Sequence, residues 1–116
     1  MFDLTSANIV AGLIGLFFVV GGIGNWIAPP RVVADYERWG YPRNFHYLTA
    51  VLEFAAGALI LNPGTRHFGA VLGALIMAAA VATLFRHKEF KHAIPAILAL
   101  AGCVIVFALL DPMPFS

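Results

Sequence analysis

Four long apolar stretches constrain the fold of this chain more than any other feature of its sequence. We expect them to form helices over about residues 7–27, 44–61, 66–86 and 92–110. A bilayer core about 30 Å thick requires about 20 apolar residues per helix, and the four stretches approach that length. The sequence therefore predicts an all-α integral membrane four-helix bundle, with a single transmembrane domain over residues 1–116.

The composition excludes several other classes of protein. Only 11% of the residues are charged and the net charge is +1, whereas a typical soluble domain has about 25% charged residues. The few basic residues lie near helix ends and form no patch that would bind nucleic acid. Cys103 is the only cysteine, so dithiol chemistry within one chain is excluded. We expect no metal site, because His87 and His92 have no third ligand at a fixed spacing.

The connection between the first two apolar stretches predicts a short helix over about residues 31–39, lying in the membrane interface. Two prolines precede it, and its side chains divide into an apolar face and a charged face. The apolar face contains Val32, Val33, Tyr36 and Trp39, and the charged face contains Arg31, Asp35 and Arg38. We interpret this helix as a connector with an aromatic belt, and a lid over a cavity mouth is the alternative.

Glu53 is the most unusual residue of the apolar stretches, because it lies in the middle of the second one. An acidic side chain at the centre of a membrane helix costs roughly 2.5–3.5 kcal/mol on insertion scales, so such residues usually mark functional sites. His46 and Thr49 share its helical face. We expect no direct contact between His46 and Glu53, which are about two turns apart, although water could join them. A structural glutamate that bonds a neighbouring helix is the alternative.

Residues at matching depths on the other segments complete a candidate site. Counting about 1.5 Å per residue from the helix ends places Asn25 and Thr83 level with His46, and Met77 beside Glu53. Trp39 and Tyr41 are interpreted first as interface anchors and second as ligand-stacking residues. The candidate ligand-binding residues are Asn25, Trp39, Tyr41, His46, Thr49, Glu53, Met77 and Thr83, and the candidate catalytic residues are Glu53 and His46.

The distribution of basic residues predicts the orientation in the membrane. One side carries Arg31, Arg38, Arg43, Arg86, Lys88 and Lys91, and the other carries Arg66 alone. By the positive-inside rule, both termini lie on the non-cytoplasmic side, and we expect a bacterial inner-membrane protein. The first segment lacks a basic N-terminal region and a clear cleavage site, so we expect it to be retained as a helix.

Several residues together resemble the DoxX-like family of small membrane proteins. They are Asn25-Trp26, Trp39-Gly40-Tyr41-Pro42, Glu53 with Gly57-Ala58-Leu59, Leu61-Asn62-Pro63, Met77 and Ala80. The resemblance implies a four-helix membrane bundle, and the family takes its name from a subunit of a thiosulfate:quinone oxidoreductase. A quinone and an oxidoreductase partner are therefore candidates. Related sequences often have a lysine where this chain has Asn25, so a charge-pair mechanism does not transfer to this chain.

Three functions are compatible with these observations. The first is binding of a quinone-like or other lipophilic small molecule between the helices, in support of an oxidoreductase. The second is proton-coupled export through Glu53, and the third is a membrane isomerase or hydrolase that uses Glu53 as acid or base. Gly69 and Gly73 form a G-x-x-x-G pair, which is a common helix-packing signal. Four short helices give a small core, and the glycine-bearing faces indicate association, so we expect a homodimer or a larger homo-oligomer.

Overall fold

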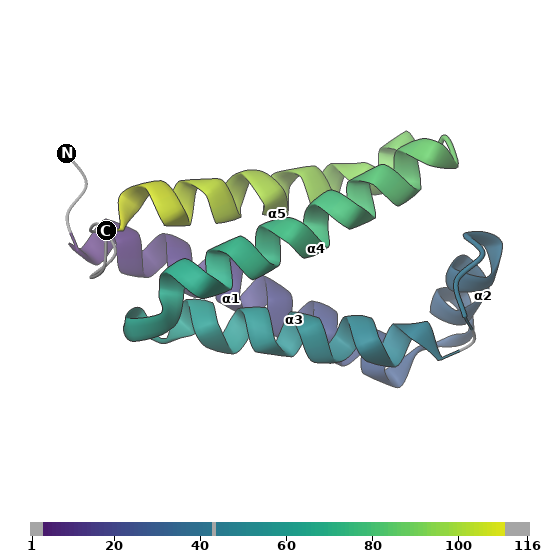
Figure 1. The fold of residues 1–116 in the computed structure, drawn as a ribbon, viewed down its shortest axis with the longest axis horizontal. Coiled ribbons are helices and arrows are strands. Elements are labelled where there is room, and N and C mark those ends of the chain that lie inside the picture. Colours follow the sequence, from purple (N-terminus) through teal and green to yellow (C-terminus); the bar gives the residue numbers. More distant parts are fainter. Residues whose placement is uncertain (1–3, 43, 111–116) are drawn as a thin grey trace.

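The computed structural model describes residues 4–42 and 44–110, and within these ranges it contains helices and no strands (Figure 1). The elements are α1 (Leu4–Ile27), α2 (Pro30–Arg38), α3 (Phe45–Leu61), the 3-10 helix η1 (Pro63–Thr65), α4 (Arg66–Arg86) and α5 (Phe90–Leu109). The predicted all-α class, with four long helices and one short helix, is therefore confirmed.

The long helices have the length and surface of membrane spans. α1, α4 and α5 contain 24, 21 and 20 residues, which at about 1.5 Å per residue suffices to cross a hydrocarbon core about 30 Å thick. α3 is also apolar but contains 17 residues, at the lower limit of about 17–25 for a span. Large apolar side chains such as Leu13, Leu75 and Leu98 are exposed on the outer surface. The chain is therefore an integral membrane protein whose outer surface faces lipid.

The backbone between α1 and α3 places α2 across one end of the bundle (Figure 1). Ala28 has a φ of 49°, which reverses the chain directly after α1, and Pro29 cannot continue the helix. Pro30 occupies the first turn of α2, where a missing N–H is tolerated. Gly40 follows α2 with a φ of 83°, a conformation that favours glycine. The turns at Ala28 and Gly40 separate α2 from the long helices on both sides.

The four long helices form two antiparallel pairs, α1 with α3 and α4 with α5 (Figure 1). The pairs meet most closely near η1, where Gly69 of α4 lies against the α3 backbone. A Cβ atom at Gly69 would lie 2.5 Å from the backbone nitrogen of Ile60. Gly73 faces the ring of Phe18 and the sulfur of Cys103, which join α1 and α5 to the same core. Away from η1 the two pairs separate toward the end that carries α2.

A buried guanidinium ties three helices together at the η1 end. Arg66 is 5% exposed, and its Nε donates to the carbonyl of Ile60 at 2.6 Å. Its Nη1 donates to Oδ1 of Asn8 at 2.9 Å, and its Nη2 to the carbonyl of Leu61 at 3.3 Å. The last carbonyls of α3, which have no partner within their own helix, are thereby satisfied by a cation. This end of the bundle is closed by backbone contact and by hydrogen bonds.

Candidate functional site

Asn25, near the end of α1, is the centre of a hydrogen-bonded network inside the bundle. Its Nδ2 donates to Oε1 of Glu53 at 2.5 Å and to the carbonyl of Gly21 at 3.1 Å. Its Oδ1 accepts a hydrogen bond of 2.8 Å from the hydroxyl of Tyr36. Its backbone carbonyl lies 3.0 Å from Nδ1 of His46, which must be the donor because a carbonyl oxygen only accepts. One amide therefore connects residues from α1, α2 and α3.

Glu53 is held by this network in the interface between α1 and α3. The residue is 4% exposed, and Gly21 of α1 makes room for its carboxyl group. A Cβ atom at Gly21 would lie 2.5 Å from Oε2 of Glu53, so a larger residue would displace the carboxyl group. Among the described residues, the ion pairs of the chain involve Arg38, not Glu53. The carboxyl group is therefore bound by a neutral amide rather than by a cation.

Next to the network, a cavity of ≈ 170 Å³ lies between α2, α3 and α4. Its walls are mainly aromatic and aliphatic, and the rings of Tyr41 and Phe45 are stacked with centroids 4.5 Å apart. Four of the side chains in its walls carry a hydroxyl group, namely those of Tyr36, Tyr41, Thr49 and Thr83. The lining residues are Tyr36, Trp39, Tyr41, Phe45, Thr49, Leu52, Ile76, Ala79, Ala80, Thr83 and Leu84. An apolar cavity of about 150 Å³ can hold benzene, so this volume suits one six-membered ring.

Tyr36 connects the cavity with the buried network. Its side chain lines the cavity, while its hydroxyl donates to Asn25. Burial raises the pKa of Tyr36, an effect opposed by a hydrogen bond with Thr49 and reinforced by the nearby carboxyl group of Glu53. At neutral pH the hydroxyl therefore keeps its proton and remains a donor. A hydrogen-bonded chain thus runs from the cavity wall through Asn25 to Glu53.

The predicted site residues fall into two adjoining groups and one outlier. Trp39, Tyr41, Thr49 and Thr83 line the cavity, and the hydroxyls of Tyr41 and Thr83 bond each other at 2.5 Å. Glu53, Asn25 and His46 form the network. Met77 is buried in the apolar core with Phe18 and Ala70, and it is not among the residues that line the cavity.

Asn25 forms hydrogen bonds with two residues of α3, His46 and Glu53, that lie at different depths in the bundle. The sequence predicted that Asn25 lies level with His46 and that Glu53 lies deeper. Asn25 bonds both, because its backbone carbonyl faces His46 while its side-chain amide reaches Glu53. His46 and Glu53 are thus connected through one protein residue.

Three residues of the site region were not among the predicted site residues. Tyr36 was interpreted as an interface anchor, although its position on the inner face of α2 could have indicated a hydroxyl directed inward. Gly21 belongs to a glycine cluster before Pro29, a signal of close approach without an indicated partner. Glu89 lies in the short connection between α4 and α5, and no sequence signal connects it with α2.

Two wider hollows lie elsewhere on the surface and lack these polar groups. One of ≈ 370 Å³ is lined by Ile23, Trp26, Ile27 and Phe54. The other, of ≈ 360 Å³, lies between α4 and α5 and is lined by Ala70, Val71, Ala74, Leu75, Cys103, Val104, Phe107 and Ala108. Almost all of their lining side chains are apolar, and lipid chains suffice to fill them. The cavity beside Tyr36 is the candidate site because hydroxyl groups line it and a buried acid lies behind it.

Comparison with known proteins gives one match. No curated protein and no solved structure is found to match the chain. A family model described as DoxX-like family matches residues 9–107, which include the whole of the network and the cavity. The chain therefore belongs to the DoxX-like family.

Proposed function

We propose that this protein binds the ring of a quinone-like or similarly sized lipophilic molecule in the cavity between α2, α3 and α4. The observation that carries the proposal is the double position of Tyr36, which lines the cavity and also bonds the Asn25–Glu53 pair. The volume suits one ring, and the aromatic walls offer surfaces for stacking. An apolar tail on such a ring would extend between the helices into lipid.

The polar side chains give each part of the site a role. The hydroxyls of Tyr41 and Thr83 share one hydrogen bond, so the other of their two hydrogens can be donated to a carbonyl oxygen of a bound ring. Tyr36 forms part of the wall against that ring. Asn25 is held by Glu53 on one side and by Tyr36 on the other, so its amide has a single orientation. Glu53 does not line the cavity, so it acts through Asn25 and Tyr36 as a positioning residue.

The basic residues around the cavity end support an orientation. Arg31, Arg86, Lys88 and Lys91 are exposed at the end that carries α2. By the positive-inside rule we propose that this end faces the cytoplasm and that both termini lie on the other side. A Lys88→Cys variant in intact cells should resist a membrane-impermeant thiol reagent until the cells are permeabilised. Labelling before permeabilisation would contradict this orientation.

Binding can be tested with a short-chain ubiquinone as the probe. The protein is placed in lipid nanodiscs with Trp26→Phe, so that Trp39 is the remaining tryptophan, and quenching of its fluorescence is measured against ubiquinone per lipid. We expect saturable quenching by ubiquinone. Tyr36→Phe should bind ubiquinone about tenfold more weakly, because it removes the hydrogen bond to Asn25 that fixes Tyr36 in the cavity wall.

The matched control is Tyr47→Phe. Tyr47 lies on α3 but is 41% exposed and does not line the cavity. Its loss should leave the affinity within about twofold. A parent protein whose quenching rises linearly with ubiquinone and never saturates would contradict the proposed function.

A further inference from the structure

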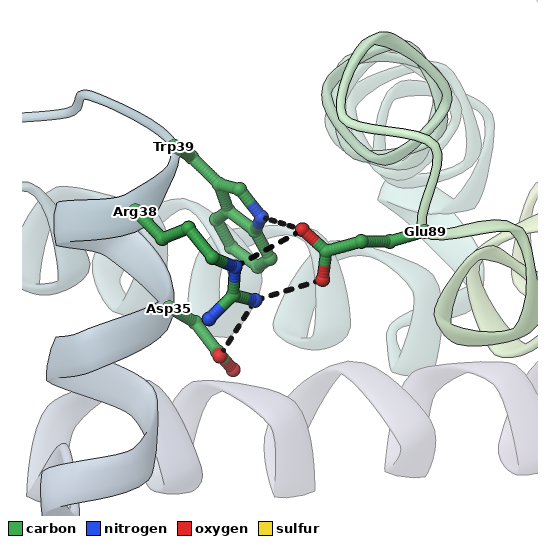
Figure 2. A network of polar contacts seen from close by, with 4 residues as sticks. All are labelled: Asp35, Arg38, Trp39 and Glu89. Atoms are coloured by element: carbon green, nitrogen blue, oxygen red, sulfur yellow. Dashed lines mark hydrogen bonds and ion pairs between the residues drawn. The ribbon is translucent and has the colours of Figure 1, made fainter.

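We propose that Glu89 is a positioning residue, which holds Trp39 in the cavity wall and thereby closes the cavity at the α2 end. The inference rests on the proposed function only where it treats the enclosed space as a ligand site. Figure 2 shows Glu89 extending from the turn between α4 and α5 toward Arg38 and Trp39 of the α2 region.

Both oxygens of the Glu89 carboxylate accept hydrogen bonds from these two residues. Its Oε2 accepts from Nε1 of Trp39 at 2.8 Å and from Nε of Arg38 at 3.2 Å. Its Oε1 accepts from Nη2 of Arg38 at 2.7 Å, and the same Nη2 lies 2.9 Å from Oδ1 of Asp35. The guanidinium group of Arg38 and the indole N–H of Trp39 thus donate to the same carboxylate group. We refer to Glu89, Arg38 and Trp39 as the latch.

The position of Glu89 in its own helix makes this arrangement informative. Glu89 is the N-cap residue of α5, where an acidic side chain commonly accepts a hydrogen bond from the first backbone N–H groups. Here the side chain makes no such bond. Its carboxylate accepts hydrogen bonds from the α2 region instead, so the contact joins two segments at the same end of the bundle that are 50 residues apart in the sequence.

α2 depends on side-chain contacts of this kind for its position. None of its residues is fully buried, and turns at Ala28 and Gly40 separate it from α1 and α3. Tyr36 joins it to α1 through Asn25, while the latch joins it to the α4–α5 side. The ring of Trp39 lines the cavity on one side and is fixed by Glu89 on the other. Loss of the carboxylate therefore frees this wall and removes the contact of α2 with the α4–α5 side, while Tyr36 still joins α2 to α1.

A purely structural ion pair would have a different signature. Exposed ion pairs contribute little to folding, so a latch that serves only stability would have almost no measurable effect. A latch that positions Trp39 changes how readily molecules reach the cavity, while the fold of the long helices remains intact. Access to the cavity is therefore the readout that separates the two roles.

The experiment measures modification of a cysteine inside the cavity of the full chain in nanodiscs. Ala80→Cys places a thiol in the cavity wall, and Cys103→Ala removes the native thiol. A small methanethiosulfonate reagent is added, and its rate of reaction is compared between variants. We expect Glu89→Ala to raise the rate by roughly fivefold, as for loss of one partly exposed interaction. Glu89→Gln should raise it less, because its amide oxygen still accepts from Trp39.

The matched control is Glu37→Ala, which removes an exposed carboxylate from α2 and should leave the rate within about twofold. Equal rates for the parent and Glu89→Ala, or equal increases for Glu89→Ala and Glu37→Ala, would overturn the proposal. The assay uses no quinone. A faster rate with no ubiquinone binding would therefore contradict the proposed function alone, and ubiquinone binding with an unchanged rate would contradict the latch alone.

Discussion

The two ends of this bundle are built in different ways from the same four long helices. At the η1 end, Gly69 brings two helix backbones into contact, and Arg66 binds the last carbonyls of α3. At the α2 end, the helix pairs separate, and side chains of Tyr36 and Trp39 enclose a cavity. The η1 end is held by backbone contacts and buried hydrogen bonds, and the α2 end is held by side-chain hydrogen bonds around open space.

The difference indicates that the two ends of the bundle have different roles, one in stability and the other in ligand binding. Closely packed backbones have few alternative arrangements, because overpacking by even one methyl group is costly. An element held by side-chain bonds can move without unfolding the core. We infer that the η1 end determines the stability of the fold and that the α2 end carries ligand binding. Substitutions at the two ends should therefore affect different measurements.

The largest effect on stability is expected at Arg66. Arg66→Met removes three hydrogen bonds and leaves buried carbonyls without a donor, so we expect a loss of about 3 kcal/mol in the free energy of unfolding. Arg86 lies at the other end of the same helix and is exposed. Arg86→Met should cost less than about 1 kcal/mol. Denaturant unfolding in mixed micelles measures both, and equal losses would contradict the proposed division between the ends.

A second stability effect is expected at the crossing of α3 and α4. Gly69→Ala places a Cβ atom against the backbone of Ile60, which no rotamer change can relieve, so we expect a loss of about 2 kcal/mol. Gly12 of α1 has open space at its Cβ position, and Gly12→Ala should be neutral or slightly stabilising. The same unfolding measurement compares them. A tolerated Gly69→Ala would show that the two pairs are not in tight contact at this end.

At the α2 end, a comparable glycine substitution should change binding instead of stability. Gly21→Ala displaces the Glu53 carboxyl group from Asn25 and so releases Tyr36, and we expect about tenfold weaker ubiquinone binding. Gly24 has open space around its Cβ position, so Gly24→Ala should leave the affinity within about twofold. Trp39 quenching reports both variants. Unchanged affinity in Gly21→Ala would separate Glu53 from ligand binding.

The smallest effect is expected from acidification of the latch. Hydrogen bonds from Arg38 and Trp39 lower the pKa of Glu89, so the latch is fully formed above the ordinary carboxyl pKa of about 4.3 and is lost as the pH falls through the lowered value. Asp35 and His92 also face this group, from α2 and α5. In the Trp26→Phe protein, the Trp39 emission maximum should shift at acid pH. The same shift in Glu89→Gln would assign it to Asp35 or His92.

Much of the fold could be predicted from the sequence because apolar stretches and prolines act locally. The run from Phe45 to Leu61 is mainly apolar and forms one helix, and α1 ends one residue before the Pro29-Pro30 pair. The helical class follows from such features without any knowledge of tertiary contacts. The separation of the two pairs at one end could not be predicted, because it depends on how glycines and large side chains meet across different helices.

The candidate site was predictable only in part, for a related reason. The shared face of His46, Thr49 and Glu53 follows from helical spacing within α3. The bond between Tyr36 and Asn25 depends on the reversal of the chain at Ala28, where a non-glycine residue has a positive φ that no pattern indicates. The contact of Glu89 with Trp39 could be predicted even less, because the side chain of an N-cap residue usually bonds its own helix, and here it accepts a hydrogen bond from Trp39 instead.

The most direct test of the central claim is to fill the cavity. Ala79 lines the cavity and is an exposed residue, so Ala79→Phe adds a ring of a size that would fill most of a space of ≈ 170 Å³. Ala78 is the preceding residue, is also exposed and does not line the cavity, which makes Ala78→Phe the matched control. We predict that Ala79→Phe abolishes saturable ubiquinone binding, while Ala78→Phe binds with the parent affinity. Undiminished saturable binding to Ala79→Phe would contradict the account, because the ligand would then lie outside this cavity.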